Sequence, residues 1–182
     1  IGIDNDDWQK SKDYLLSFAG LLVLDADALN RISESELGSK FFLERKFKTW
    51  ITPHRKEFSR LFPYFKCETN VGLAFNAAKE FNISVLLKGA NSIVADNKKA
   101  WQLFGTDSQT ARAGLGDLLC GFIAGSSAID LTFCRNITSD FLAKYVLLHS
   151  FAASKCKLGS NASAIGDELS KLMRNWKMRQ IS

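Results

Sequence analysis

The sequence lacks several features that would place a protein in a class immediately. Its four cysteines, Cys67, Cys120, Cys134 and Cys156, occur singly, without the paired spacing of a zinc site or a disulfide framework. Its short apolar runs, such as Leu21–Leu24, fall far below the roughly 20 residues that span a bilayer. No repeat, low-complexity tract or linker interrupts it. These absences argue against a disulfide-rich secreted domain or a zinc module, and they predict a cytoplasmic protein with no membrane segment.

The charge pattern gives little support to a nucleic-acid function. The 24 basic and 19 acidic residues leave a formal net charge of +5, but the two signs are interleaved along the chain. The sequence shows no candidate DNA-recognition helix with clustered arginines and lysines, so we expect no nucleic-acid partner. A modest positive excess does suit an anionic phosphate ligand.

The length suits one domain. With 182 residues, 46% of them hydrophobic, the chain can bury a core without disulfides or metal. It starts at Ile1, and its first residues show neither the basic region nor the apolar core of a signal peptide. We therefore expect a single domain over residues 1–182 that is an N-terminally incomplete fragment.

Strand and helix signals alternate along the chain. Short apolar runs predict strands at 21–24, 49–51, 83–87 and 92–95, with a polar helical stretch after the first. Apolar spacing of three and four predicts helices at 54–62, 70–81, 118–129, 140–156 and 164–176. This alternation indicates an α/β fold with a mostly parallel central sheet flanked by helices.

Polar groups that could do chemistry follow three of the predicted strands. Asp25 and Asp27 come after the first, His54 after the second and Lys88 after the third. An open parallel sheet places its ligands at the carboxyl ends of its strands, so these positions suit a binding site. Each group also has an ordinary structural explanation: a strand-end acid, a packed or capping histidine, or a solvated lysine.

A glycine-rich turn precedes the longest apolar helix. In Gly114-Leu-Gly-Asp117, backbone N–H groups at the helix start and the positive end of its dipole could cradle an anion. Asp117 could then accept a proton from a hydroxyl that is being phosphorylated. The alternative is a tight helix start in which Asp117 is a first-turn capping carboxylate.

Taken in order, these segments resemble the successive motifs of NAD(P)H-hydrate dehydratases, which are ribokinase-like enzymes. The matching segments are Asp25-Ala-Asp-Ala-Leu-Asn30, Thr52-Pro-His-Arg-Lys-Glu-Phe58, Leu87-Lys-Gly-Ala90, Gly114-Leu-Gly-Asp-Leu-Leu-Cys-Gly121 and, in the late helix, Leu148-His-Ser150. The first two separate this family from sugar kinases, which share chiefly the final Gly-x-Gly-Asp. The resemblance covers the chain from about Ile1 to its end.

The resemblance implies an enzyme that transfers a phosphoryl group from ATP or ADP to the C6 hydroxyl of hydrated NADH or NADPH. Elimination of phosphate then restores the reduced ring, and Mg²⁺ accompanies the nucleotide. Asp117 is implied to be the base at that hydroxyl and to contact the substrate. It also implies a homo-oligomer and an epimerase domain, fused or separate, as a partner.

The same resemblance assigns the remaining site residues. Those implied to bind the nucleotide are Lys88, Gly89, Ala90, Asn91, Ser92, Gly114 and Gly116. Those implied to contact the hydrated cofactor are His54 and Gly2. Those implied to shape the site, or to reach a metal through water, are Asp25, Asp27, Asn30 and Glu57.

Two departures from the family pattern stand out. Ala113 and Leu115 replace a second glycine and a small hydroxyl residue in the anion loop, which removes a donor, adds bulk and predicts weaker nucleotide binding. The family also has an earlier strand-and-helix portion, of which Gly2 would be a remnant. Two other readings stay open: another ribokinase-like small-molecule kinase, and a degenerate, non-catalytic nucleotide-binding subunit.

Overall fold

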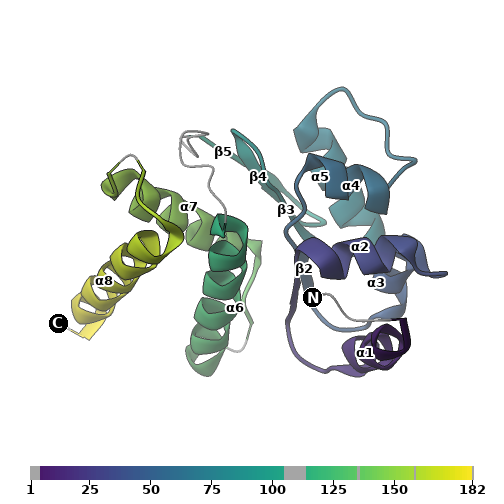
Figure 1. The fold of residues 1–182 in the computed structure, drawn as a ribbon, viewed down its shortest axis with the longest axis horizontal. Coiled ribbons are helices and arrows are strands. Elements are labelled where there is room, and N and C mark those ends of the chain that lie inside the picture. The colour runs from purple at the N-terminus through teal and green to yellow at the C-terminus, as the bar shows by residue number, and fades with distance from the viewer. Residues whose placement is uncertain (1–4, 105–113, 135, 158, 182) are drawn as a thin grey trace. The chain divides into compact units, whose positions relative to one another are not determined.

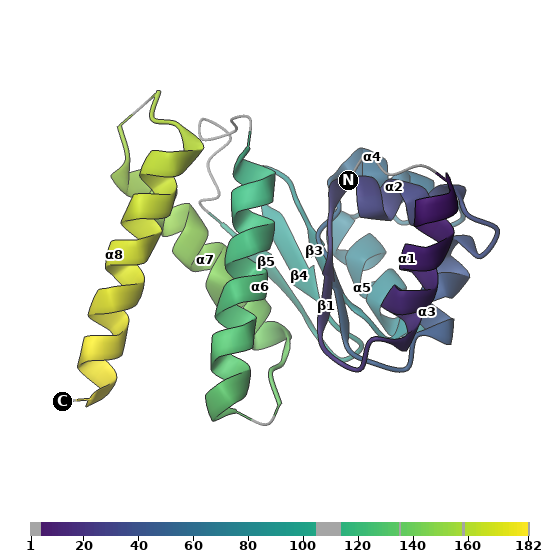
Figure 2. The same cartoon turned by 60° about the horizontal axis from the view of Figure 1, so that its bottom comes forward.

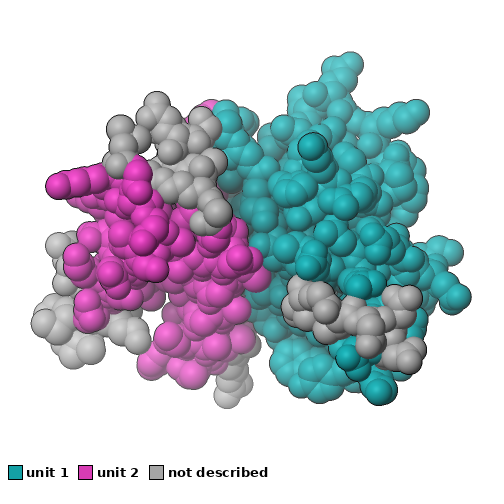
Figure 3. Space-filling model, viewed as in Figure 1, with its two compact units in different colours: residues 1–102 teal, residues 103–182 magenta. Residues whose placement is uncertain are grey.

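The structure, a computed structural model, describes residues 5–104, 114–134, 136–157 and 159–181. It divides into two compact units, Ile1–Gln102 and Leu103–Ser182, which are described separately (Figure 3). The first unit carries the sheet and the second carries three long helices (Figure 1).

Strands and helices alternate in unit 1, as expected for an α/β fold. Its elements are α1 (Asn5–Ser17), β1 (Leu22–Leu24), α2 (Ala26–Glu34), η1 (Gly38–Lys40), α3 (Phe41–Glu44), β2 (Thr49–Ile51), α4 (Arg55–Leu61), α5 (Asn70–Phe81), β3 (Ser84–Leu87), β4 (Ser92–Ala95) and β5 (Ala100–Leu103), whose last residue belongs to unit 2. Helices α1 to α5 lie on one side of the sheet in both ribbon views (Figures 1 and 2).

The sheet has the order β1-β2-β3-β4-β5. The pairs β1–β2 and β2–β3 are parallel, with Trp50 of β2 opposite Val23 on one side and Ser84 on the other. Parallel pairing is possible there because helices connect β1 to β2 and β2 to β3. Residues 88–91 are too few for such a crossover, so β3 and β4 pair antiparallel. The predicted α/β class is confirmed, and two of the three pairings with a described register are parallel.

A cluster of phenylalanines forms the centre of the unit 1 core. Phe42 of α3, Phe58 of α4 and Phe81 of α5 gather around Phe62, and all four are at most 2% exposed. Ring centroids lie 4.9 Å apart for Phe58 and Phe62 and 5.1 Å apart for Phe62 and Phe81. Aromatic pairs at such distances stabilise beyond the area that they bury, so α3, α4 and α5 are held together beneath the sheet.

Arg45, just after α3, ties the end of α1 to the sheet. Its guanidinium donates to the backbone carbonyls of Leu15, of Phe18 at 2.8 Å and of Gly20 at 2.6 Å. Its Nε donates to Thr49 Oγ1 at 2.9 Å. Only 5% of Arg45 is exposed, so one buried cation satisfies several carbonyl groups that would otherwise lack partners.

Unit 2 consists of α6 (Leu115–Phe133), α7 (Ser139–Lys155) and α8 (Ala162–Ile181). The hydroxyl of Tyr145 on α7 donates to Asp130 Oδ2 on α6 at 2.6 Å, and burial together with this contact raises the pKa of Tyr145. Within the described ranges α6 alone is long and apolar enough to cross a membrane by length and composition, a test that core helices of soluble proteins also pass.

Most of the predicted elements are observed. The helix over 70–81 and the strands at 49–51 and 92–95 have the predicted bounds, and the others agree within a few residues at most ends. The helix near 118–129 is longer, because it begins at Leu115 directly after the glycine turn. Neither α1 nor β5 was predicted, since both have few apolar residues in a regular pattern.

Candidate active site

Three predicted site residues meet at the carboxyl ends of the parallel strands in unit 1. Asp25 directly follows β1, His54 is the third residue after β2 and Lys88 directly follows β3. The Lys88 N–H donates to the Pro53 carbonyl at 2.8 Å, and His54 and Lys88 form a parallel bridge beyond the ends of their strands. The residue implied to bind substrate and the residue implied to bind nucleotide are therefore neighbours.

Asp25 and Lys88 form a largely buried ion pair. Lys88 Nζ lies 2.6 Å from Asp25 Oδ1, and the two side chains are 22% and 8% exposed, respectively. Asp25 occupies the N-cap position of α2, yet its side chain makes no capping hydrogen bond. The carboxylate that could cap a helix is instead committed to the lysine.

His54 begins α4 as its N-cap. Its Nδ1 accepts from the backbone N–H groups of Lys56 at 3.1 Å and Glu57 at 3.2 Å, and the backbone N–H of His54 donates to Glu57 Oε2 at 2.8 Å. An Nδ1 that accepts leaves the proton of the neutral ring on Nε2. His54 Nε2 lies 3.4 Å from Glu57 Oε1, and the His54 side chain is 47% exposed, so a ligand can reach the ring while Nδ1 holds the helix.

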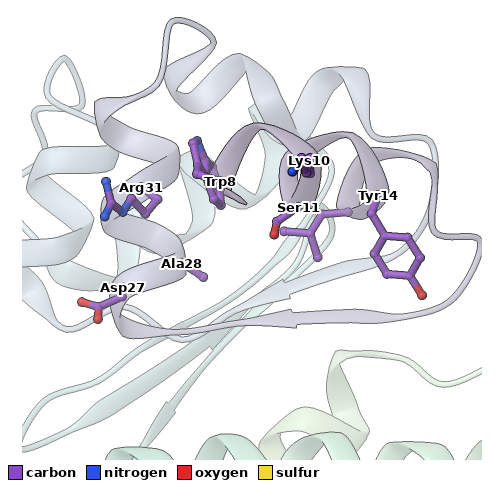
Figure 4. Close-up of a pocket in the computed structure, with 8 residues that line it drawn as sticks. Trp8, Lys10, Ser11, Tyr14, Asp27, Ala28 and Arg31 are labelled. Atoms are coloured by element: carbon purple, nitrogen blue, oxygen red, sulfur yellow. The ribbon is translucent and has the colours of Figure 1, made fainter. Parts of the chain in front are cut away.

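Asp27 belongs to a different neighbourhood from the Asp25–Lys88 pair. It lies with Trp8, Lys10, Tyr14 and Arg31 around a pocket of about 410 Å³ between α1 and α2 (Figure 4). Its nearest motif partner is Asn30, whose Nδ2 is 3.5 Å from Asp27 Oδ1. Asp27 and Asn30 are thus neighbours of each other, while Asp25 is directed to Lys88.

The segment that the resemblance assigns to nucleotide binding forms the turn between β3 and β4. Gly89, Ala90 and Asn91 are exposed, whereas Ser92 begins β4 and is 7% exposed. The Ser92 hydroxyl donates to the Gly89 carbonyl at 3.4 Å, which closes the turn. The exposed backbone of this turn directly follows Lys88.

A second group of predicted site residues lies in unit 2, where α6 begins. Gly114, the N-cap, has φ +82° and no side chain to cap the helix, a backbone conformation that favours glycine. The first intrahelical bond runs from the Leu118 N–H to the Gly114 carbonyl at 3.0 Å, so the N–H groups of Leu115, Gly116 and Asp117 have no intrahelical acceptor. That arrangement suits an anion.

Asp117 is exposed in the first turn of α6. Among the described residues its carboxylate makes no hydrogen bond or ion pair. It stands at one end of a groove of about 800 Å³ between α6 and α8, whose α6 wall continues through Gly121 and Gly125 and whose α8 wall includes Ser163 and Asp167. The capping role considered from the sequence is therefore not seen in the described structure, and the carboxylate faces open space.

The bulk of Leu115 is directed into the helical core. Leu115 is 9% exposed and packs with residues of α7 and α8, including Ala152 and Ile165. The substitution removes a hydroxyl from the loop, but its side chain does not occupy the exposed side on which Asp117 lies. Ala113 and Gly2, also singled out from the sequence, lie outside the described residues.

The described residues provide no dense cluster of metal-binding side chains. No group of three or more His, Cys, Asp or Glu side chains there could hold a metal ion. Mg²⁺ commonly binds through one or two carboxylates together with substrate phosphates, a mode that does not require such a group.

The fold and the site together define an α/β protein of the ribokinase-like class. A ribokinase-like superfamily protein of Enterococcus faecalis has the same fold, with a TM-score of 0.79 and 21% identity over 97% of this chain and 61% of that one. A Bacillus subtilis structure, an ADP/ATP-dependent NAD(P)H-hydrate dehydratase co-crystallised with ATP and Mg²⁺, gives a TM-score of 0.66 at 18% identity and covers 94% of this chain and 60% of that one.

The profile of the NAD(P)H-hydrate dehydratase family matches residues 1–174, and the chain belongs to that family. A bifunctional NAD(P)H-hydrate repair enzyme of Gloeobacter violaceus is 39% identical over 106 residues, which cover 58% of this chain and 20% of the relative. One from Methanopyrus kandleri is 27% identical over 183 residues, which cover 96% of this chain and 34% of the relative. The chain therefore spans a minor part of these curated relatives. The family prediction is confirmed.

Two features of the site were not predicted from the sequence. The pairing of Asp25 with Lys88 joins motifs 63 positions apart, and no local pattern announces such a contact. The α8 wall of the groove carries Gly166 and Arg174. The groove could have been predicted from the four-residue spacing of Asp117, Gly121 and Gly125, because that spacing places two glycines on the same helix face as the acid.

Proposed function

We propose that this chain performs the ATP- or ADP-dependent dehydration of hydrated NADH or NADPH. The observation that carries the proposal is the exposed carboxylate of Asp117 at the glycine-capped start of α6, in a chain of the NAD(P)H-hydrate dehydratase family. A base beside a set of unsatisfied N–H groups can accept a proton where negative charge develops.

The proposed reaction has two stages. Asp117 accepts the proton of the substrate C6 hydroxyl as its oxygen attacks the terminal phosphorus of ATP or ADP, and the bond from that phosphorus to the departing nucleotide breaks. The phosphorylated intermediate then loses inorganic phosphate by cleavage of the C6–O bond, while a ring proton leaves and the double bond of the reduced nicotinamide returns. Alignment of the groups carries most of the catalysis in phosphoryl transfer.

The strand-end residues would position the two ligands. Lys88 and the turn 89–92 would hold nucleotide phosphates, and His54 would contact the hydrated cofactor through its exposed ring. In unit 2, Gly114 and Gly116 would bind a phosphate at the start of α6. The parallel bridge between His54 and Lys88 supports adjacent binding of substrate and nucleotide. Mg²⁺ would neutralise phosphate charge when the nucleotide is bound, while Asp117 stays available as the base.

Three further statements belong to the same proposal. Four free cysteines suit a reducing cytoplasm. Exposed apolar side chains, among them Phe133 and Phe151 at 82% and 48% exposure, suit a homo-oligomer, which light scattering would detect. The relatives are bifunctional repair enzymes by name, and a second activity in them is consistent with an accompanying epimerase domain here.

Nucleotide binding and product analysis test the proposal. ADP or ATP with Mg²⁺ should raise the melting temperature of the chain, and AMP should raise it less, by mass action on the folded state. Insensitivity to all three at millimolar concentration would contradict the proposal. A stable phosphorylated product without recovery of reduced nicotinamide would instead favour a ribokinase-like kinase, while binding without turnover would favour a non-catalytic subunit.

A further inference from the structure

We propose that Asp25 is the positioning residue for Lys88, which meets the nucleotide as one half of a neutral ion pair. The inference rests on the proposed function, because it assumes that Lys88 contacts a nucleotide phosphate. It assigns a specific task to a carboxylate for which the sequence suggested only a general supporting role.

Both ends of Lys88 are fixed. Its backbone N–H donates to Pro53 at 2.8 Å, and its bridge to His54 sets the register of the chain just after β3. Its ammonium lies 2.6 Å from Asp25 Oδ1. Since the strand order is β1-β2-β3, the side chain extends across the end of β2 to reach the carboxylate after β1. A flexible four-carbon side chain is thereby restrained to one direction.

The local structure around Asp25 departs from two ordinary preferences. An aspartate at the N-cap usually accepts from the first turn of its helix, but the Asp25 side chain makes no such bond. The next residue, Ala26, has φ +47°, a left-handed conformation that disfavours residues other than glycine. Departures of this kind persist where surrounding contacts over-determine them, and the described contact that accounts for the direction of the carboxylate is the one with Lys88.

The pair changes what Lys88 can offer to an anion. With Asp25 8% exposed, withdrawal of Lys88 would leave a buried carboxylate without a counter-charge, which is strongly unfavourable. The ammonium therefore stays on Asp25 and uses its remaining N–H donors toward phosphate oxygens. Asp25 thus sets where those donors lie, and the neutral pair contributes placement rather than net attraction.

The test compares ADP binding and steady-state kinetics of the wild-type chain with Asp25→Asn, Lys88→Met and the double variant. Removing one charge-assisted contact should weaken ADP binding roughly tenfold in either single variant. If Asp25 acts through Lys88, the double variant should bind no more weakly than Lys88→Met alone. The nucleotide KM should rise in Asp25→Asn, while kcat at saturating nucleotide stays within about threefold.

Asp13→Asn is the matched control, because it removes the same charge from an exposed position on α1 of the same unit that has no part in the proposed site. It should leave ADP binding within about twofold. Asp25→Glu keeps the charge and moves the carboxylate by one carbon, so it should fold and still raise the nucleotide KM if position matters.

The outcomes separate the two proposals. Suppose that the wild type binds ADP. The positioning role alone is then overturned if the ADP affinity of Asp25→Asn is unchanged or higher, or if that of Asp25→Glu is unchanged. It is also overturned if the losses of the two single variants multiply in the double variant. Absence of ADP binding by the wild type overturns the proposed function, and the positioning role with it. Should Asp25→Asn fail to fold, the Asp25→Glu result decides.

Discussion

The polar side chains that follow the strands of unit 1 have partners within that unit, whereas the acid at the start of α6 in unit 2 is exposed. Asp25 and Lys88 pair at 2.6 Å, and His54 holds α4 through Nδ1. Asp117 has no hydrogen-bond or ion-pair partner within the described ranges. Paired groups are suited to placing ligands, since their positions are fixed. An exposed carboxylate in ionised form is suited to taking up a proton. The four predictions below test this division.

The largest expected effect is on turnover by Asp117→Asn. The amide keeps the size of the side chain but cannot accept the hydroxyl proton, so kcat should fall about 10²–10⁴-fold. Melting temperature and ADP affinity should change little, because no described contact of the carboxylate is lost. Asp167→Asn on α8, in the same groove, should retain most of the activity. Near-wild-type turnover of Asp117→Asn would remove Asp117 from the chemistry.

Arg45→Ala should cause the largest loss of stability. It removes a buried cation and leaves the carbonyls of Phe18 and Gly20 without this partner, at a cost of about 3 kcal/mol in the free energy of unfolding. Urea unfolding measures that loss, with exposed Arg60→Ala as control. A change below about 1 kcal/mol would show that the α1 contacts contribute little to holding unit 1.

His54→Asn separates a cap from a ligand contact. Asparagine is a favoured N-cap, so the free energy of unfolding should stay within about 1 kcal/mol of wild type. Because the exposed ring is lost, the KM for the hydrated cofactor should rise roughly tenfold. His54→Ala, which loses both roles, should also be less stable. An unchanged KM in His54→Asn would limit this residue to capping.

The smallest effect concerns His149, buried on α7 with Nε2 unpaired in the described structure. Burial lowers its pKa below the usual value of 6.5. As the pH falls below about 6.5, the unfolded chain takes up a proton before the folded chain does, so stability is complete above that pH and declines below it. Between pH 7.5 and 5.5, His149→Met should lose about 1 kcal/mol less stability than wild type. Equal losses in urea unfolding would indicate that His149 is not the group responsible.

The sequence predicted the strand-end positions well for a physical reason. Buried parallel strands are short apolar runs, and polar residues that follow them mark the carboxyl edge of the sheet. Asp25, His54 and Lys88 were found in this way. The α6 start was also predictable, because Gly114 precedes a long apolar stretch with an acid in its first turn.

The partners of individual side chains could not be predicted from the sequence. Asp25 and Asp27 are both aspartates and lie two positions apart, yet Asp25 pairs with Lys88 and Asp27 lines the α1–α2 pocket. Only the conformation at Ala26, with φ +47°, and the long-range packing of the strands separate them. Leu115 was expected to add bulk to the anion loop, whereas burial against α7 and α8 directs it into the core.

The most direct test follows reduced-nicotinamide absorbance while the chain acts on hydrated NADH or NADPH with Mg²⁺ and either ATP or ADP, alongside release of inorganic phosphate. The account predicts recovery of absorbance that requires the nucleotide, with about one phosphate released for each cofactor restored, as the two-stage reaction demands. Nucleotide-independent recovery, or nucleotide consumption that leaves a stable phosphorylated product and no absorbance, would contradict it.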